Sequence, residues 1–140
     1  MLLLGATGNL GSRLLPALLA HHHTVVAMVR FQAKLATIMA QYGSTRVRTP
    51  IPNLTIIEGD ATDSSAIRRA LLDHDCDAIV DVAGNQVAPW KEPVLGRIVR
   101  AVVDAAVAVG RERGRPLRAW LIGGLGSLKY PGMEGHLIQD

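Results

Sequence analysis

The sequence contains a single cysteine, few aromatic residues and no long apolar run. Cys76 has no second cysteine with which to form an intrachain disulfide, as is typical of proteins in a reducing cytosol. No apolar run approaches the roughly 20 residues that a membrane-spanning helix needs. The opening MLLLG also lacks the basic region and the length of a signal peptide. We therefore expect a cytoplasmic protein with no membrane partner.

Apolar residues are instead abundant in short runs. The 140 residues are 49% hydrophobic, which is enough for one domain to bury a substantial core. Strands of a parallel sheet that is covered by helices on both faces contain such continuous apolar runs. The formal net charge of +3 suits an anionic small ligand as well as a nucleic acid, so it does not separate the two.

Strand-like runs alternate with helical patterns along the chain. Apolar runs predict strands at Leu2–Gly5, Thr24–Val29, Leu54–Ile57, Asp77–Ala83 and Ala119–Gly124. Apolar residues at helical spacing predict helices between them, at about 10–19, 35–42, 64–74 and 92–109. This alternation indicates right-handed crossovers and a parallel sheet. We predict an α/β fold, a Rossmann-type doubly wound parallel sheet of about five strands in one domain over 1–140. No full helical repeat follows the fifth strand, so we expect the fold to be truncated at its C-terminus.

Five residues have specific expected roles in these helices. Pro16 removes a backbone hydrogen bond from the first helix and should kink it. Asp63 is placed to cap the third helix, whose apolar face should include His74. Leu95 begins the expected apolar face of the fourth helix, and Gly110 is suited to end that helix.

The motif GATGNLG joins the first strand to the first helix. Its glycines are Gly5, Gly8 and Gly11. Gly5 permits a tight exit from the strand, Gly8 lets backbone approach a pyrophosphate, and Gly11 lets the helix pack closely on the sheet. The free N–H groups of the helix N-terminus then face the phosphates. The loop predicts a dinucleotide site, although a plain turn is the alternative.

Basic residues follow the second predicted strand. Arg30 stands at its end and Lys34 follows one helical turn later, with no acidic residue between His23 and Gln41. An acidic residue here would hold the 2′-hydroxyl of NAD, whereas arginine accepts the 2′-phosphate of NADP. The pattern favours NADP(H) over NAD(H), with a solvated helix start as the alternative reading. Asp60 ends the third strand at the same edge, where it either meets a ligand or only forms a turn.

The motifs GATGNLG, VR…K, GDATD and GGLGS occur in the order and spacing of a known family. The chain resembles the N-terminal cofactor half of the atypical short-chain dehydrogenase/reductase superfamily, in its NmrA-like, NAD(P)-binding branch. Within that branch it is most similar to the fungal averufin-oxidase-like group. The resemblance implies a cofactor site on the first loop and on the ends of the later strands. Its residues are Gly5, Thr7, Gly8, Asn9, Leu10, Gly11, Arg30, Lys34, Asp60, Ala61, Ala83, Gly84 and Asn85.

Within that set the resemblance implies separate roles. The backbone of Asn9 and Leu10 would meet the pyrophosphate, and Arg30 with Lys34 would meet the 2′-phosphate. The pair Asp60–Ala61 would lie against the adenine. The AGN sequence at 83–85 would lie beside the adenine ribose.

A catalytic pair of the short-chain reductase type is missing from the sequence. Those enzymes use Tyr-x-x-x-Lys with an upstream serine, because the lysine lowers the pKa of the tyrosine. The residues four positions after Tyr42 and Tyr130 are arginine and glutamate. Ser127 matches the family's serine, so Ser127 and Tyr130 are the candidate catalytic residues, with a plain turn residue as the alternative reading of Ser127.

Other features carry simpler interpretations. The run His21–His23 reads as a solvated helix end, and no cluster of metal-ligand spacing accompanies it, so no metal is expected. The arginine-rich segment 111–118 lacks interleaved aromatics, so no nucleic-acid partner is expected. The acidic neighbours of Cys76 disfavour a reactive thiolate. The long fourth helix leaves a homodimer possible.

Three functional hypotheses remain open. The first is an NADP(H)-binding reductase that transfers hydride to an unidentified small carbonyl or quinone-like substrate. The second is a non-catalytic regulator that senses NADP(H) and acts through a protein partner. The third is a truncated form that folds but lacks activity.

Overall fold

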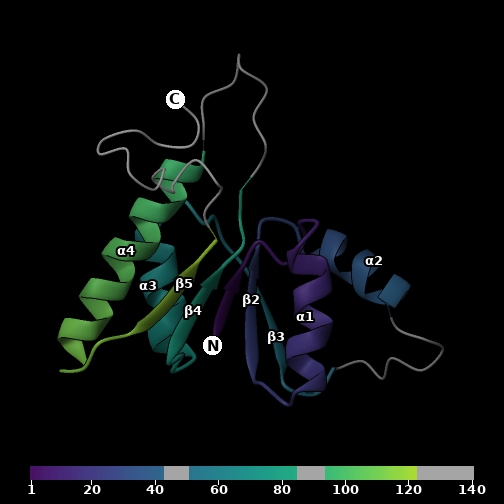
Figure 1. The fold of residues 1–140 in the computed structure, drawn as a ribbon, viewed down its shortest axis with the longest axis horizontal. Helices are drawn as coiled ribbons and strands as arrows, with labels where there is room; N and C mark the ends of the chain where they lie inside the picture. Colours follow the sequence, from purple (N-terminus) through teal and green to yellow (C-terminus); the bar gives the residue numbers. More distant parts are fainter. Residues whose placement is uncertain (43–50, 85–93, 123–140) are drawn as a thin grey trace, which may run out of the picture.

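The computed structural model describes residues 1–42, 51–84 and 94–122, which form one parallel sheet with helices on both faces (Figure 1). The strands are β1 (Leu2–Leu4), β2 (Val25–Val29), β3 (Leu54–Glu58), β4 (Ala78–Asp81) and β5 (Arg118–Leu121). The helices are α1 (Gly11–Ala20), α2 (Gln32–Tyr42), α3 (Ser64–Asp73) and α4 (Leu95–Glu112). All neighbouring strands pair in parallel, in the order β3-β2-β1-β4-β5. The predicted doubly wound α/β fold is confirmed.

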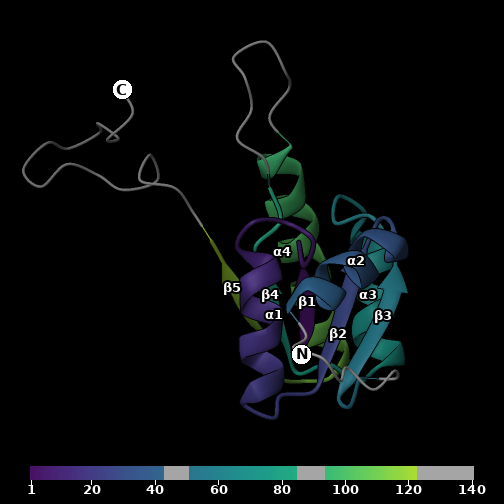
Figure 2. The same cartoon turned by 90° about the vertical axis from the view of Figure 1, so that its right-hand side faces the viewer.

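The sheet separates two apolar cores. Helices α1 and α2 pack on one face, and α3 and α4 pack on the other (Figure 2). Successive side chains of a strand point to opposite faces, so Leu3 joins the α1/α2 core while Leu2 and Leu4 join the α3/α4 core. All three leucines are fully buried. The short first strand is therefore the centre of both cores.

Helix α3 begins at the predicted cap. The Asp63 carboxylate accepts the backbone N–H groups of Ser65 at 2.9 Å and Ala66 at 3.2 Å, as expected for an N-cap. His74 does not lie on the buried face as predicted. It is the C-cap residue and is exposed, because the helix ends one residue earlier and the chain turns away there. Helix α1 runs from Gly11 to Ala20 with Pro16 inside it.

Helix α4 differs from the prediction at both ends. It continues through Gly110 to Glu112, and Gly110 instead permits close approach of the following loop, since a β carbon there would lie 3.2 Å from the Arg115 carbonyl oxygen. Leu95 is exposed. The buried residues are Ile98, Ala101, Val102, Ala105 and Val109. Because α4 packs against α3 as well as the sheet, its buried face is turned from the one that spacing alone suggested.

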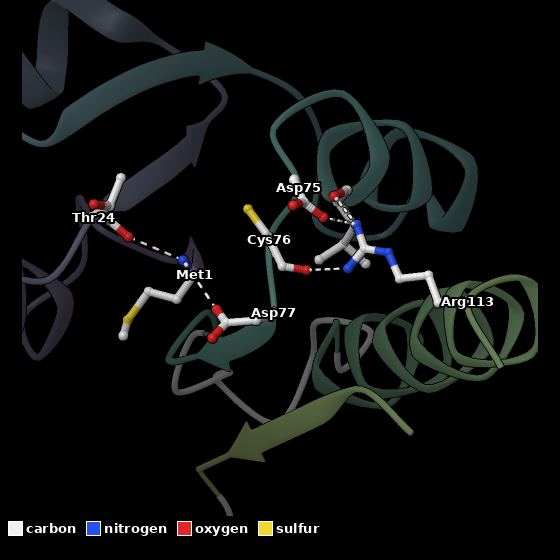
Figure 3. A network of polar contacts seen from close by, with 7 residues as sticks. Met1, Thr24, Asp75, Cys76, Asp77 and Arg113 are labelled. Carbon is white, nitrogen blue, oxygen red and sulfur yellow. Dashed lines mark hydrogen bonds and ion pairs between the residues drawn. The ribbon is translucent and has the colours of Figure 1, made fainter. Parts of the chain in front are cut away.

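Polar contacts tie the elements together at the amino-terminal edge of the sheet (Figure 3). The Arg113 guanidinium donates to the carbonyl oxygens of Cys76 at 2.6 Å and Leu71 at 2.9 Å, and lies 3.1 Å from the Asp75 carboxylate. It thus joins the end of α4 to the turn between α3 and β4.

Burial raises the pKa of the Cys76 thiol. Among the described residues, no helix combines the length and apolarity that crossing a membrane requires.

Candidate cofactor site

A pocket of about 240 Å³ opens at the carboxyl-terminal edge of the sheet. It lies beyond the ends of β1, β2, β3 and β4, and the first turn of α4 closes one side. The chain order changes direction between β1 and β4. In open α/β sheets this is the point at which ligands bind.

The glycine loop shapes the floor of this pocket. Gly5 has a φ of +82°, and a β carbon on it would lie 2.5 Å from the Ala83 nitrogen. Both facts require glycine where the loop leaves β1. The N–H of Gly8 donates to the Gly5 carbonyl at 2.9 Å, which closes the turn. Gly11 packs so closely on Gly5 that a β carbon there would overlap the Gly5 carbonyl.

The N-terminus of α1 is left without a side-chain cap. Its N-cap residue Leu10 offers no side-chain acceptor to the first-turn N–H groups, and the first turn carries no acidic residue. In the described part of the chain, the N–H groups of Asn9 and Leu10 have no protein acceptor. Helix α3, by contrast, is capped by Asp63. The open end of α1 therefore offers N–H donors and a positive dipole end to an anion.

Two basic residues line the pocket beyond β2. Arg30 directly follows the strand, and Lys34 lies in the first turn of α2. Both residues are exposed, and neither forms an ion pair with any described residue. The pocket thus presents two exposed basic side chains near the glycine loop, without an ion pair to any residue that the structure describes.

Asp60 forms a turn at the end of β3. One carboxylate oxygen accepts both the N–H of Thr62 at 2.8 Å and its hydroxyl at 2.9 Å. These hydrogen bonds, first the one from the Thr62 backbone, hold the pKa of Asp60 below its ordinary value, and the nearby charges of Arg30 and Arg97 act in the same direction. Asp60 is therefore a carboxylate whose hydrogen-bonding capacity is already partly used within its own turn.

Asp81 holds the backbone on the β4 side of the pocket in place. It is 2% exposed at the end of β4, and its carboxylate accepts the N–H of Ala83 at 2.9 Å. Burial raises the pKa of this carboxyl group, against the lowering effect of that hydrogen bond. The contact orients the backbone of Ala83 and Gly84, which line the pocket.

The structure brings most of the residues predicted for the site into one lining. These are Gly5, Thr7, Gly8, Arg30, Lys34, Asp60, Ala61, Ala83 and Gly84. Asn9, Leu10 and Gly11 belong to the same loop but do not line the pocket. Asn85, Ser127 and Tyr130 lie outside the described residues. What each of these residues binds stays a prediction.

Sequence reasoning missed several lining residues. They are Met28, Val29, Gly59, Thr62, Val82, Val94 and Ile98. A threonine two positions after an aspartate is a turn signal, so Thr62 could have been found. Val94 and Ile98 could not, because the start of α4 reaches the pocket only through the crossover after β4.

Several solved structures share this fold. A short-chain dehydrogenase/reductase family oxidoreductase from Burkholderia thailandensis is 22% identical, with a TM-score of 0.63 over 89% of this chain and 51% of its own. Serine dehydrogenase from Escherichia coli is 25% identical, with a TM-score of 0.59 over 94% of this chain and 65% of its own. Leucoanthocyanidin reductase from Vitis vinifera, solved with NADPH, is 23% identical, with a TM-score of 0.57 over 78% of this chain and 32% of its own.

The chain thus spans between about a third and two thirds of the length of these structures. No curated protein matches the sequence. The model of one protein family, described as NAD(P)H-binding, matches residues 5–114. That match covers the glycine loop, the basic residues after β2 and the turn at Asp60, so the chain belongs to the NAD(P)H-binding family.

Proposed function

We propose that the pocket binds NADP(H) and that the protein is a reductase acting on a small carbonyl or quinone-like substrate. The observation that carries the proposal is the pair Arg30 and Lys34, which line the same pocket as the glycine loop and form no ion pair with any described residue. A phosphate dianion is the ligand that two adjacent unpaired cations favour, and arginine can bind it through two parallel hydrogen bonds.

The glycine loop fits the pyrophosphate of the same cofactor. Gly8 is exposed, and among the described residues a β carbon there would meet only the Gly5 carbonyl oxygen, at 3.2 Å. The backbone at Gly8 is therefore open to a ligand, and the uncapped N–H groups of Asn9 and Leu10 follow directly. A pyrophosphate at this point would supply the acceptors that α1 lacks.

The remaining lining residues would hold the adenosine. Asp60 and Ala61 would lie against the adenine, and Ala83 and Gly84 beside its ribose, with Asn85 following. The apolar side chains of Val94 and Ile98 supply a surface for a flat ring. Asp81 acts at one remove, since it holds the Ala83 N–H and so positions this backbone.

A bound nicotinamide would supply the hydride, so the protein's own contribution is binding and orientation. Ser127 and Tyr130 are the residues proposed to touch the substrate. The sequence offers no Tyr-x-x-x-Lys pair to move a proton. That lack favours a second candidate function, a regulator that binds NADP(H) and performs no reduction.

Titration with NADPH and NADH, followed by fluorescence, tests the cofactor assignment. The protein should bind NADPH at least tenfold more tightly than NADH. Arg30→Asp should abolish the preference, whereas Arg69→Asp, an equal charge change on the exposed face of α3, should preserve it. Equal affinity of the unaltered protein for both cofactors would overturn the NADP(H) assignment.

Oxidation of bound NADPH separates the two functions. A panel of carbonyl and quinone compounds should include at least one that is reduced at a rate above the buffer background. If NADPH binds but no compound of the panel is reduced, the regulator is the better description.

We further propose that the chain belongs to the NmrA-like branch and to its fungal averufin-oxidase-like group, as the sequence motifs favour. The single cysteine favours a cytoplasmic location.

A further inference from the structure

The first turn of α4 carries a basic residue, Arg97, beside the pocket. Val94 and Ile98 line the pocket from this end of the helix. Residues three apart lie on the same side of a helix, so Arg97 stands next to Val94, and it directly precedes Ile98 in the chain. Arg97 is exposed and forms no ion pair with any residue that the structure describes. It therefore stands at the rim of the pocket.

The charge of Arg97 acts on Asp60, which lines the same pocket from the turn after β3. The hydrogen bonds from Thr62 contribute most to the lowered pKa of Asp60, and the charges of Arg30 and Arg97 lower it further. Arg100 lies one turn further along α4 and is also exposed, but its charge has no such effect. Two arginines from different elements thus flank the Asp60 turn.

The pocket beside this turn offers few surfaces on which a flat base could stack. The part of the lining that the structure describes contains no aromatic side chain. Its apolar residues Ala61, Val94 and Ile98 can contact one face of a ring. A guanidinium is planar and stacks on aromatic rings, and proteins that bind nucleobases use arginine in this way. An arginine at the rim could therefore cover the other face.

The surroundings of the two arginines assign them to different parts of a ligand. Arg30 has a second cation, Lys34, in the same lining, and such a pair suits a phosphate dianion. The neighbours of Arg97 in the lining are instead the apolar Val94 and Ile98. This setting suits a planar ring better than a phosphate, because a phosphate favours several donors.

We propose that Arg97 packs its guanidinium on the adenine ring of the bound dinucleotide and so determines specificity for an adenine-containing cofactor. The inference rests on the proposed function, to which it adds a contact from α4. NADP(H) and NAD(H) share the adenine ring. Arg97 should therefore increase the affinity for both cofactors and leave the choice between them to Arg30.

Fluorescence titration of Arg97→Ala with NADPH and NADH tests the contact. Both dissociation constants should rise about tenfold, and by about the same factor. Arg100→Ala is the matched control, because Arg100 lies about 200° around the helix from Ile98, and both dissociation constants should stay unchanged. A loss confined to NADPH would place Arg97 at the 2′-phosphate and overturn the proposal. Equal binding by Arg97→Ala and the unaltered protein would also overturn it.

Arg97→Lys separates stacking from charge. Lysine keeps the positive charge near Asp60 but has no planar group, so both dissociation constants should remain about fivefold higher than those of the unaltered protein. Full recovery of affinity by this variant would show that charge alone acts and would refute the stacking. Circular dichroism checks that each variant is folded.

The same titrations distinguish a failure of this inference from a failure of the proposed function. If the unaltered protein binds neither NADPH nor NADH, the proposed function is overturned and the adenine contact with it. If the unaltered protein binds both and Arg97→Ala binds them equally well, only the adenine contact is wrong.

Discussion

Gly11 lies directly against the carbonyl of Gly5, so that the first turn of α1 and the end of β1 touch through backbone atoms alone. This contact fixes how the helix leaves the sheet. It also explains why Gly11 is required although it does not line the pocket. The loop and the open helix end depend on it together.

Gly11→Ala should therefore affect both stability and binding. The added methyl group overlaps the Gly5 carbonyl, and relief of such overpacking costs about 1–3 kcal/mol. The loop must shift to make room, so we expect a lower melting temperature and weaker NADPH binding in fluorescence titrations. Gly96→Ala is the matched control, because no described residue lies within 4 Å of its added β carbon. Unchanged binding by Gly11→Ala would contradict the close contact.

Thr62→Val removes one of the two hydrogen bonds that Asp60 accepts. The folded-state pKa of Asp60 lies below its ordinary value of 3.8, so the stabilisation is complete above that value and is lost as the pH falls through the folded pKa. The variant should be less stable by about 0.5–1 kcal/mol at pH 7, and this difference should shrink as the pH falls through the folded-state pKa of Asp60 and the carboxylate is protonated. Urea unfolding measures both, and NMR titration should show a higher pKa for Asp60.

Thr37→Val provides the comparison for this prediction. Its hydroxyl donates to the Ala33 carbonyl on α2 at 3.1 Å, with no carboxylate involved. Any loss of stability there should not change with pH in the acidic range. The same pH dependence in both variants would show that Asp60 is not its source.

Asp81→Asn should have the opposite dependence on pH. Burial raises the folded-state pKa of Asp81 above 3.8, so the unfolded chain loses this proton first as the pH rises. The free energy of unfolding then falls across the window between the two pKa values. Asparagine does not titrate, and its side-chain oxygen can still accept the Ala83 N–H.

The difference in stability between Asp81→Asn and the unaltered protein should thus shift in favour of the variant from pH 4 to pH 7. Urea unfolding at both values measures it. A difference that is constant with pH would mean that the burial of Asp81 does not raise its pKa.

Arg113→Met tests the contacts of Figure 3. The side chain is 16% exposed and donates to two backbone carbonyls and an exposed carboxylate. Its loss leaves the Cys76 and Leu71 carbonyls without this donor, so we expect destabilisation of about 2–3 kcal/mol by urea unfolding. Arg113→Lys should recover only part of it, because an ammonium cannot reach both carbonyls as a planar fork does. Arg13→Met, at an exposed position of α1, should cost less than about 0.5 kcal/mol.

The strands were predictable because their signal is local. Val25–Val29 is an uninterrupted apolar run and is buried at every residue, as a strand covered on both faces must be. The end of α4 was not predictable from Gly110. A glycine often ends a helix, but here its missing side chain serves contact with the loop at Arg115 instead.

The residues of the pocket also differ in whether local sequence or distant contacts place them there. Arg30 and Asp60 could be assigned to one place because the carboxyl ends of parallel strands share one edge of the sheet. Met28 and Ile98 could not, since each reads as an ordinary core residue until a strand and a helix distant in sequence enclose the pocket. Asp81 is similar: nothing in its local sequence shows that it would be buried.

By itself, the sequence determined the order of strands and helices, the glycine loop and the cations that follow β2. These depend on residue type and short-range spacing, which set backbone freedom and the side of an element that must be buried. Only the tertiary structure decided which face of α4 packs inward and which face is exposed. Those outcomes depend on how many neighbours surround a helix, and that number is set by residues far away along the chain.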